Sequence, residues 1–209
     1  MKLNIVIVDY GLGNIRSAQK SLQKVLIDNK LEGDVIRSSD YKSLLEATHI
    51  ILPGQGAFKS CIDGLNNLNG MVEELNNQVC VKKKPILGIC VGMQLFANES
   101  SENGKHLGLG WINGKITKLP NNKNILPHMG WNEISCKKNH PTFKNVSNDH
   151  FYFVHSYYFD VVEKNLIVAT ANYGIEFPAA VAKDNIFGVQ FHPEKSSESG
   201  SELISNFLI

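Results

Sequence analysis

The stretch Pro85-Ile86-Leu87-Gly88-Ile89-Cys90-Val91-Gly92-Met93-Gln94 passes from an apolar run into helical spacing. Residues 85–90 predict a buried strand, and residues 91 to about 98 predict a helix. Gly88 to Gly92 form the G-x-C-x-G version of a nucleophile elbow, a tight turn that presents its central side chain at the carboxyl edge of a sheet. The N-terminus of the helix would stabilise a thiolate there. From these five residues alone, a buried structural cysteine between two packing glycines stays open.

Strand and helix patterns also alternate upstream of this turn. The apolar run Leu3–Val8 is typical of a strand that is buried on both faces. Further strands are predicted at 34–36 and 49–52, and helical spacing covers 15–27 and 57–79. Short strands that alternate with helices predict right-handed βαβ units and a parallel sheet.

The second half of the chain has a different pattern. It predicts strands at 115–119, 131–136, 151–159, 166–172, 179–183 and 186–191, loops at 120–124 and 137–148, and one closing helix at 199–208. No linker or repeat interrupts the sequence. We therefore predict one α/β domain over residues 1–209, with a central, mostly parallel sheet flanked by helices and an antiparallel or mixed extension.

Composition excludes several classes of protein. Of the 209 residues 43% are hydrophobic and 20% are charged, so the chain is neither disordered nor fibrous. With 21 basic and 20 acidic residues it has no charge excess to favour nucleic acid or an anionic membrane as a partner. The first apolar run is short and meets Asp9, and no stretch of ~20 apolar residues occurs. A cytoplasmic location is predicted.

Neither a metal nor a cofactor is predicted. The four cysteines include no C-x-x-C pair and no zinc-ligand spacing. Gly11-Leu12-Gly13-Asn14 begins like a dinucleotide loop, but Arg16 occupies the position of the third glycine, and no P-loop occurs.

A cysteine nucleophile needs a base, and His192-Pro193-Glu194 supplies the best candidate. Residues i and i+2 of an extended segment point the same way, and Pro193 keeps His192 out of helical conformation. His192 is predicted to take the proton of Cys90, and Glu194 to orient His192. Pro53-Gly54-Gln55-Gly56, which follows another strand, can direct backbone N–H groups into the same site.

Together, these motifs resemble the class I glutamine amidotransferases, and more narrowly the glutaminase subunits of imidazole glycerol phosphate synthases. The resemblance covers residues 3–208 and implies a flavodoxin-like amidotransferase fold. The segments that carry it are Asp9–Asn14, Leu52–Phe58, Pro85–Gln94, Pro127–Asn132, Phe153–Tyr157 and Gly188–Ser196.

The resemblance implies hydrolysis of L-glutamine to glutamate and ammonia through a thioester on Cys90. It implies the catalytic triad Cys90, His192 and Glu194 and an oxyanion hole at Gly56 and Val91. The implied glutamine-binding residues are Gly54, Gln94, Glu102, Ser156 and Tyr157. Gln55 stands where the family usually has valine, and Ser201 where its closing helix usually has leucine.

The resemblance also implies a partner. In this family, ammonia passes to a separate (βα)8-barrel cyclase, which forms imidazole glycerol phosphate and an aminoimidazole carboxamide ribotide in histidine biosynthesis. The two chains would form a heterodimer, with Asn14, Trp131, Tyr152 and Lys195 at the interface.

Three alternatives stay open from the sequence. A closely similar subunit would feed ammonia to an ATP-dependent amidotransferase that modifies surface-polysaccharide sugars. The same fold can serve as a non-catalytic binding module, although such a module has no need of Cys90, His192 and Glu194 together. A cysteine peptidase would use the same elbow, but Gln94, Glu102 and Ser156 suit a free amino acid better.

Overall fold

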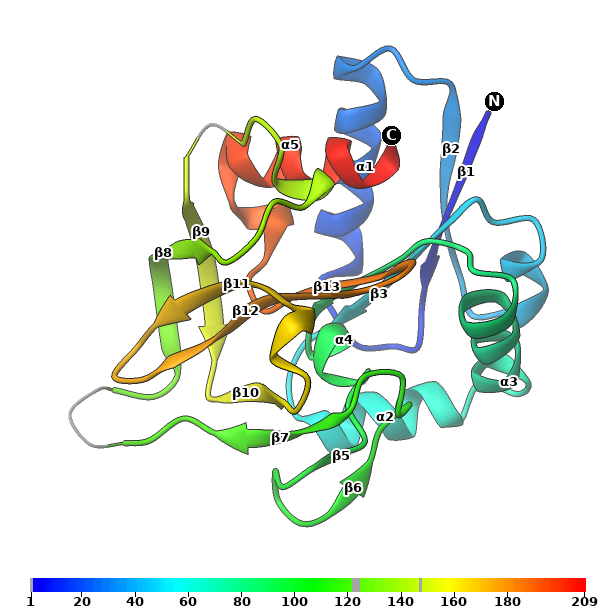
Figure 1. Ribbon diagram of the computed structural model, residues 1–209. Coiled ribbons are helices and arrows are strands. Elements are labelled where there is room, and N and C mark those ends of the chain that lie inside the picture. Colours follow the sequence, from blue (N-terminus) through cyan, green and yellow to red (C-terminus); the bar gives the residue numbers. More distant parts are fainter. Residues whose placement is uncertain (1, 122–124, 147) are drawn as a thin grey trace.

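The alternating first half of the chain forms one side of a nine-stranded sheet (Figure 1). The computed structural model describes residues 2–121, 125–146 and 148–209. The strand order is β2-β1-β3-β4-β13-β12-β11-β8-β9, and the first five strands are mutually parallel. These five are β1 (Leu3–Val8), β2 (Gly33–Ser38), β3 (His49–Gly54), β4 (Ile86–Cys90) and β13 (Ile186–Val189).

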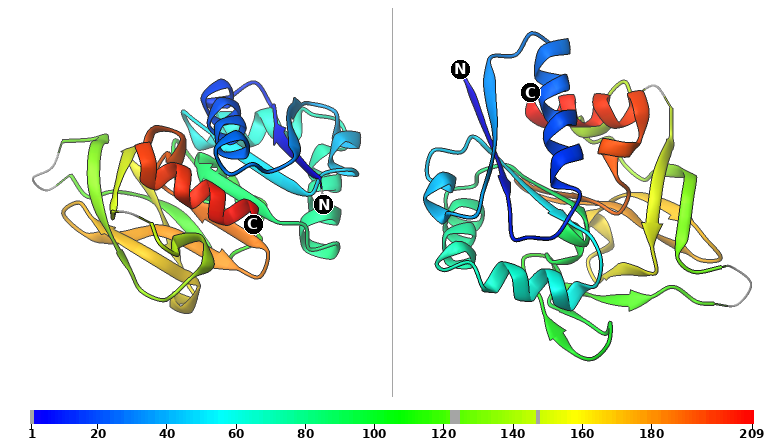
Figure 2. Two further views of the ribbon diagram at one scale, coloured as in Figure 1. Left: turned by 90° about the horizontal axis from the view of Figure 1, so that it is seen from above. Right: turned by 180° about the vertical axis from the view of Figure 1, so that it is seen from behind.

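Helices cover both faces of this parallel half. In Figure 1, α1 and α5 lie above the central strands, and α2, α3 and α4 lie below them. The right-hand view of Figure 2, from behind, shows the same separation. The helices are α1 (Ile15–Asp28), α2 (Phe58–Asn66), α3 (Met71–Leu75), α4 (Val91–Gln94) and α5 (Ser197–Leu208), with 3-10 turns η1 (Tyr41–Leu44), η3 (Pro141–Phe143), η4 (Lys164–Leu166) and η5 (Pro193–Lys195) and the π-helical turn η2 (Asn76–Val81). Because both faces are covered, five of the six residues of β1 are buried, as an uninterrupted apolar run predicts.

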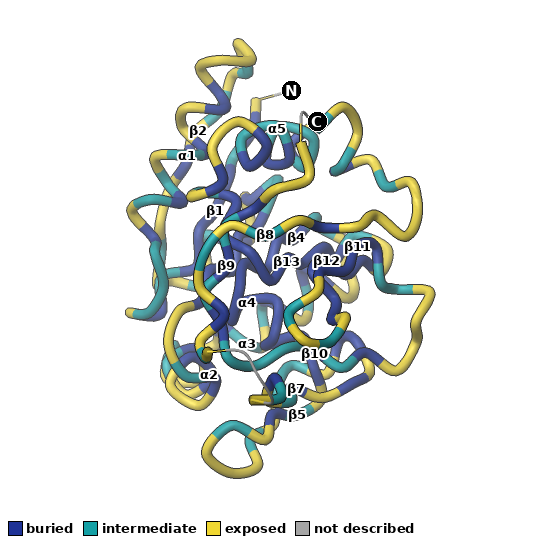
Figure 3. The backbone as a smooth tube through the Cα atoms, turned by 90° about the vertical axis from the view of Figure 1, so that its left-hand side faces the viewer, coloured by how far each residue is buried: buried dark blue, intermediate teal, exposed yellow. Residues whose placement is uncertain are grey.

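The second half extends the sheet with antiparallel strands. These are β8 (His128–Cys136), β9 (His150–His155), β11 (Ile167–Asn172) and β12 (Glu176–Lys183). A separate four-stranded sheet, in the order β10-β7-β5-β6, consists of β5 (Glu99–Ser100), β6 (His106–Leu107), β7 (Gly114–Lys118) and β10 (Tyr157–Val161). Burial is concentrated in the central strands and α4, while the outer loops are exposed (Figure 3). The predicted fold class is confirmed.

Three predicted elements were wrong in detail. The single strand expected at 151–159 is two strands, since β9 pairs with β8 in the large sheet and β10 pairs with β7 in the small one. The helix expected over 57–79 is interrupted, because Gly70 has a left-handed φ of 74° between α2 and α3.

The helix expected from Val91 to Asn98 also ends early, at Gln94. The carbonyls of the next residues accept hydrogen bonds from a later segment instead: Leu109 N–H donates to Leu95 O and Ile112 N–H to Phe96 O. A four-residue helix has a weak dipole, so the predicted contribution of the dipole to the site is small.

Within the described residues, no helix is long and apolar enough to cross a bilayer. The loops predicted at 120–124 and 137–148 include residues 122–124 and 147, which lie outside the described residues.

Candidate active site

Cys90 occupies the turn between β4 and α4 in an unusual backbone conformation. Its φ is 55° and its ψ is −112°, outside the regions that non-glycine residues normally adopt. Such a conformation persists only where the surrounding structure enforces it, and it is typical of functional sites. The strand-to-helix elbow predicted from the sequence is therefore present.

The elbow is held by a close approach of β3. A Cβ atom added at Gly92 would lie 1.8 Å from the carbonyl oxygen of Leu52, and one at Gly54 would lie 2.4 Å from the nitrogen of Gly92. No L side chain fits at either position without moving the backbone. Glycines at these two positions therefore let the carboxyl ends of β3 and β4 meet.

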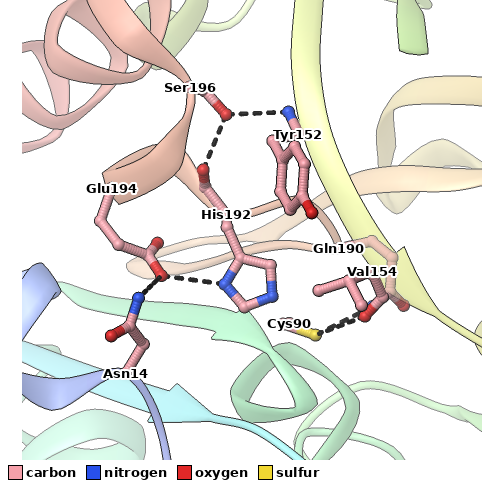
Figure 4. Close-up of polar contacts among 8 residues, drawn as sticks. All are labelled: Asn14, Cys90, Tyr152, Val154, Gln190, His192, Glu194 and Ser196. Carbon is pink, nitrogen blue, oxygen red and sulfur yellow. Dashed lines mark hydrogen bonds and ion pairs between the residues drawn. The ribbon is translucent and has the colours of Figure 1, made fainter. Parts of the chain in front are cut away.

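His192 and Glu194 follow β13 at the same edge of the sheet. His192 Nδ1 lies 2.9 Å from Glu194 Oε1, and both side chains are only 1% exposed. His192 Nε2 is buried and makes no hydrogen bond with any described residue. Figure 4 shows this nitrogen on the side of the ring that faces Cys90. The structure thus brings the three predicted triad residues together, with the histidine between the thiol and the carboxylate.

Electrostatics favour a charged His192. Burial opposes the charge, but the sulfur of Cys90 and the carboxylate of Glu194 outweigh it and raise the pKa of His192 to about 10. A protonated imidazole next to the sulfur is the arrangement that a thiolate nucleophile requires.

Two further contacts hold the His192–Glu194 segment. Asn14, which follows β1, donates from Nδ2 to Glu194 Oε1 at 3.3 Å. Ser196 Oγ donates to the carbonyl of His192 at 2.7 Å and accepts from the backbone N–H of Tyr152 at 3.0 Å (Figure 4). His192 is therefore fixed through both its ring and its backbone.

A pocket of about 300 Å³ opens onto Cys90. Its lining is Gln55, Gly56, Cys90, Val91, Gln94, Glu102, Pro127, Val154, His155, Ser156 and Tyr157. Four of the five residues predicted to bind a ligand are among them. Gly54 is not, because it packs beneath the elbow against Val91 and Gly92.

Gln94 and Glu102 contribute acceptors to the pocket. Gln94 is buried, and its Nε2 donates to the carbonyl of Tyr157 and to Gln190 Oε1, each at 3.0 Å. Its Oε1 is the atom left for a ligand, since both of these hydrogen bonds to described residues are made by the nitrogen. Glu102 Oε2 accepts from Phe58 N–H, the first residue of α2, at 2.7 Å. A carboxylate and an amide oxygen that line one pocket suit a cationic group.

The loop after β3 completes the opposite wall. Gln55 and Gly56 are exposed, and Gly56 has a φ of 91°. The carbonyl of Gln55 accepts a hydrogen bond from Cys61 Sγ at 3.4 Å. Gly56 and Val91 both line the pocket, so their backbone N–H groups are the candidate donors to an oxyanion.

The remaining cysteines lack this setting. Cys61 is buried, and desolvation raises the pKa of its thiol to about 11. Cys80 and Cys136 are exposed, and the partial desolvation of their thiols raises the pKa of each. Among the described residues, no cluster of histidine, cysteine and carboxylate groups could hold a metal ion.

Three of the four predicted interface residues form one patch. Trp131 on β8 is 54% exposed and meets the Tyr152 ring edge-on, with the ring centroids 6.2 Å apart. Lys195 Nζ lies 5.7 Å from the centroid of the same tyrosine ring. Asn14 is instead bonded to Glu194, and its role at an interface stays a prediction.

Sequence reasoning missed several residues of the site. Gln190 directly after β13, His155 at the end of β9 and His128 at the start of β8 are buried polar side chains, and Ser196 is a buried hydroxyl behind His192. A polar residue at an inward-facing position of an apolar run was the available signal, but the sequence does not show which distant strand such a residue meets.

Comparison with known proteins agrees with this geometry. The family model described as "Glutamine amidotransferase class-I" matches residues 6–209. "Imidazole glycerol phosphate synthase subunit HisH" from Pelagibacter ubique is 48% identical over 99% of each chain. The protein of the same name from Caulobacter vibrioides is 44% identical, over 98% of this chain and 97% of its own.

Solved structures match the fold. A crystal structure described as a glutamine amidotransferase superposes with a TM-score of 0.69 at 17% identity and covers 93% of each chain. A glutamine amidotransferase from Thermotoga maritima gives a TM-score of 0.62 at 16% identity, over 94% of this chain and 78% of its own.

Proposed function

The chain belongs to the class I glutamine amidotransferases, and from that premise we propose that it is the glutaminase subunit of an imidazole glycerol phosphate synthase. The observation that carries the proposal is the buried, ordered set of Cys90, His192 and Glu194 at the mouth of a small pocket. The names of the relatives support the histidine-biosynthetic role over the sugar-modifying alternative.

Hydrolysis would proceed in two steps. The Cys90 thiolate attacks the side-chain amide carbon of glutamine, and protonated His192 gives its Nε2 proton to the leaving ammonia. A water molecule, deprotonated by the now neutral His192, then attacks the γ-glutamyl thioester and releases glutamate. Glu194 keeps the Nδ1 proton on the far side of the ring in both steps, so that Nε2 always faces the reaction.

The oxyanion of each tetrahedral intermediate needs donors at the pocket wall. The N–H of Val91 follows the nucleophile directly, and the N–H of Gly56 belongs to the exposed loop opposite. Because the carbonyl of Gln55 in this loop is bound by the thiol of Cys61, a weak donor, partner binding that reorients the loop would raise turnover.

The amino-acid end of glutamine would lie at the other end of the pocket. Glu102 and the Oε1 atom of Gln94 are acceptors and would hold the α-ammonium group. Ser156 and Tyr157 border the same space. A volume of about 300 Å³ lies at the small end of the range for small-molecule sites.

The partner would be a cyclase of the (βα)8-barrel type that forms a heterodimer with this chain. The patch formed by Trp131, Tyr152 and Lys195, beside exposed Met129, supports an interface on β8 and β9. Residues 1–209 would act as one amidotransferase domain without a metal or cofactor, in the cytoplasm, where reducing conditions keep Cys90 a free thiol.

Glutamine hydrolysis by the purified chain tests this proposal. Turnover is expected to be low alone and to rise strongly when a histidine-pathway cyclase and its nucleotide ligand are both added. If turnover does not change with the cyclase but rises with a sugar-modifying ATP-dependent amidotransferase, the chain would be the glutaminase subunit of that amidotransferase instead. A folded chain that never reacts with an electrophilic glutamine analogue would make it a binding module.

A further inference from the structure

Gln190 is a fully buried amide beside the sulfur of Cys90. It follows β13 directly, is 0% exposed, and its Nε2 lies 3.6 Å from Cys90 Sγ. We propose that Gln190 donates a hydrogen bond to the Cys90 thiolate and stabilises it, as a third member of the nucleophile's environment beside His192 and the elbow. This inference rests on the proposed function only in taking Cys90 as the nucleophile.

The direction of the Gln190 amide is fixed by its neighbours. Gln94 Nε2 lies 3.0 Å from the carbonyl of Tyr157, and a backbone carbonyl only accepts, so the Gln94 amide is oriented with its nitrogen inward. The same nitrogen lies 3.0 Å from Gln190 Oε1. The oxygen of Gln190 therefore faces Gln94, and its nitrogen faces the sulfur.

Two buried histidines hold the Tyr157 carbonyl from the other side. His155 Nδ1 lies 2.9 Å from that carbonyl, and His128 Nδ1 lies 2.9 Å from His155 Nε2. Burial lowers the pKa of His155 to about 3 and that of His128 to about 4, so each ring is neutral and carries one N–H. A donating Nδ1–H on each ring satisfies both contacts.

The series of hydrogen bonds ends on β8. Asn132 Nδ2 lies 3.2 Å from His128 Nε2, and the same amide donates to the carbonyl of Asn172 at 2.9 Å. Its Oδ1 accepts from Glu133 N–H at 2.8 Å, which fixes the direction of this amide too. A connected series of hydrogen bonds therefore runs from Asn132, next to exposed Trp131, to the sulfur, and the carbonyl of Tyr157 in its middle accepts from both sides.

Two donors and one distant acceptor surround the sulfur of Cys90. Gln190 Nε2 is a donor, and protonated His192 presents a second one. An acceptor for a thiol proton is the carbonyl oxygen of Val154, which lies at a long 3.9 Å from Cys90 Sγ. The other titratable groups that interact with Cys90 are Tyr10, after β1, and Cys61 on α2; burial raises the pKa of both, so they are neutral.

The test is the ionisation of Cys90 in a variant that lacks the donor. Gln190→Met keeps the length of the side chain and removes both amide atoms. The matched control is Gln19→Met, because Gln19 Nε2 donates to the carbonyl of Val35 on β2, away from the site. Alkylation by iodoacetamide is followed against pH, and the peptide that contains Cys90 is quantified by mass spectrometry, which separates it from the other cysteines.

Loss of a hydrogen bond to a charged group predicts that the midpoint of Cys90 alkylation rises by roughly one to two pH units in Gln190→Met. The midpoint in Gln19→Met is expected to match that of the unmodified chain. An unchanged midpoint in folded Gln190→Met overturns the proposal.

If Gln190→Met does not fold, an NMR measurement on the unmodified chain tests the same proposal. The side-chain amide resonances of Gln190 are expected to shift as Cys90 titrates and to lose that shift in Cys90→Ala. Gln190 amide resonances that do not shift as Cys90 titrates overturn the proposal. Failure of the proposed glutaminase function can be distinguished from failure of this inference. The first would appear as no reaction with a glutamine analogue, and the second as an unchanged pH midpoint of Cys90 alkylation.

Discussion

Replacing Glu194 with glutamine isolates the charge behind the histidine. In Glu194→Gln the side chain keeps its shape and an oxygen acceptor, and it loses its negative charge. Asn14 Nδ2 already donates to the atom that binds His192, so an amide placed there turns its oxygen toward both donors. The tautomer of His192 is therefore kept, and only the charge assistance is lost.

The size of the effect follows from that distinction. A hydrogen bond to a charged group contributes about 1.5–3 kcal/mol, which corresponds to a loss of about 10- to 150-fold in kcat/KM for glutamine. In the double variant Asn14→Ala/Glu194→Gln the amide is free to turn. Its nitrogen then faces Nδ1, and the loss grows toward about 10⁴-fold, the scale of a reversed histidine tautomer.

The pH profile supplies the second readout. Negative charge at Glu194 helps to raise the pKa of His192 to about 10, so its removal lowers that pKa. Because the active form needs protonated His192, the alkaline limb of kcat/KM is expected to move to lower pH. The assay is glutamine hydrolysis with the cyclase present, and ammonia-dependent synthesis by the same complex is the control. An alkaline limb that stays in place or moves upward, or a full rate, would refute this role of Glu194.

Three further predictions follow from the same geometry. Gly92→Ala places a Cβ atom 1.8 Å from a backbone carbonyl, so the elbow must shift by about 1 Å and glutamine turnover is expected to fall about 100-fold or more. In Gly110→Ala the Cβ has nothing nearer than 3.7 Å, but the φ of 69° strains an L side chain, so this variant should lose some stability and retain turnover. Equal losses of turnover in the two variants would contradict the close approach at Gly92. Glu102→Gln removes the pocket carboxylate, so KM for glutamine should rise more than kcat falls in steady-state kinetics, and an unchanged KM would remove Glu102 from the site. Because folding raises the pKa of His192 from 6.5 to about 10, protonated His192 stabilises the folded chain fully below pH 6.5, and this stabilisation is lost as the pH rises through about 10. The fall in Tm between these pH values should be smaller in Glu194→Gln than in the unmodified chain. Identical curves of Tm against pH would mean that the His192–Glu194 pair does not contribute to folding stability.

The sequence anticipates the elements with the strongest local signals. Leu3–Val8 is a strand with the bounds that its apolar run predicts, because both of its faces meet helices. The sequence also indicates why Cys90, His192 and Glu194 lie close together, since one strand ends at Cys90, another ends shortly before His192, and parallel strands end at one edge of the sheet.

Other features depend on contacts that no local pattern encodes. The break at Ser156 arises because the strands on either side of it pair in different sheets, although the residues alternate as in one strand. The helix after Cys90 stops at Gln94 because a segment near residue 110 donates hydrogen bonds to the carbonyls of the residues that follow it. Gln190 shows the same limit at the site, since its meeting with Gln94 and Cys90 joins elements about 100 residues apart.

The most direct test of the central claim is the chemical identity of the nucleophile. The complex with a histidine-pathway cyclase is mixed with glutamine, quenched in acid during turnover, and searched by mass spectrometry for a γ-glutamyl adduct. We expect the adduct on the peptide that contains Cys90, and we expect Cys90→Ala to lose glutamine-dependent synthesis by about 10⁴-fold or more while ammonia-dependent synthesis continues. An adduct on Cys61, Cys80 or Cys136, or glutamine-dependent synthesis that survives in Cys90→Ala, would contradict the account.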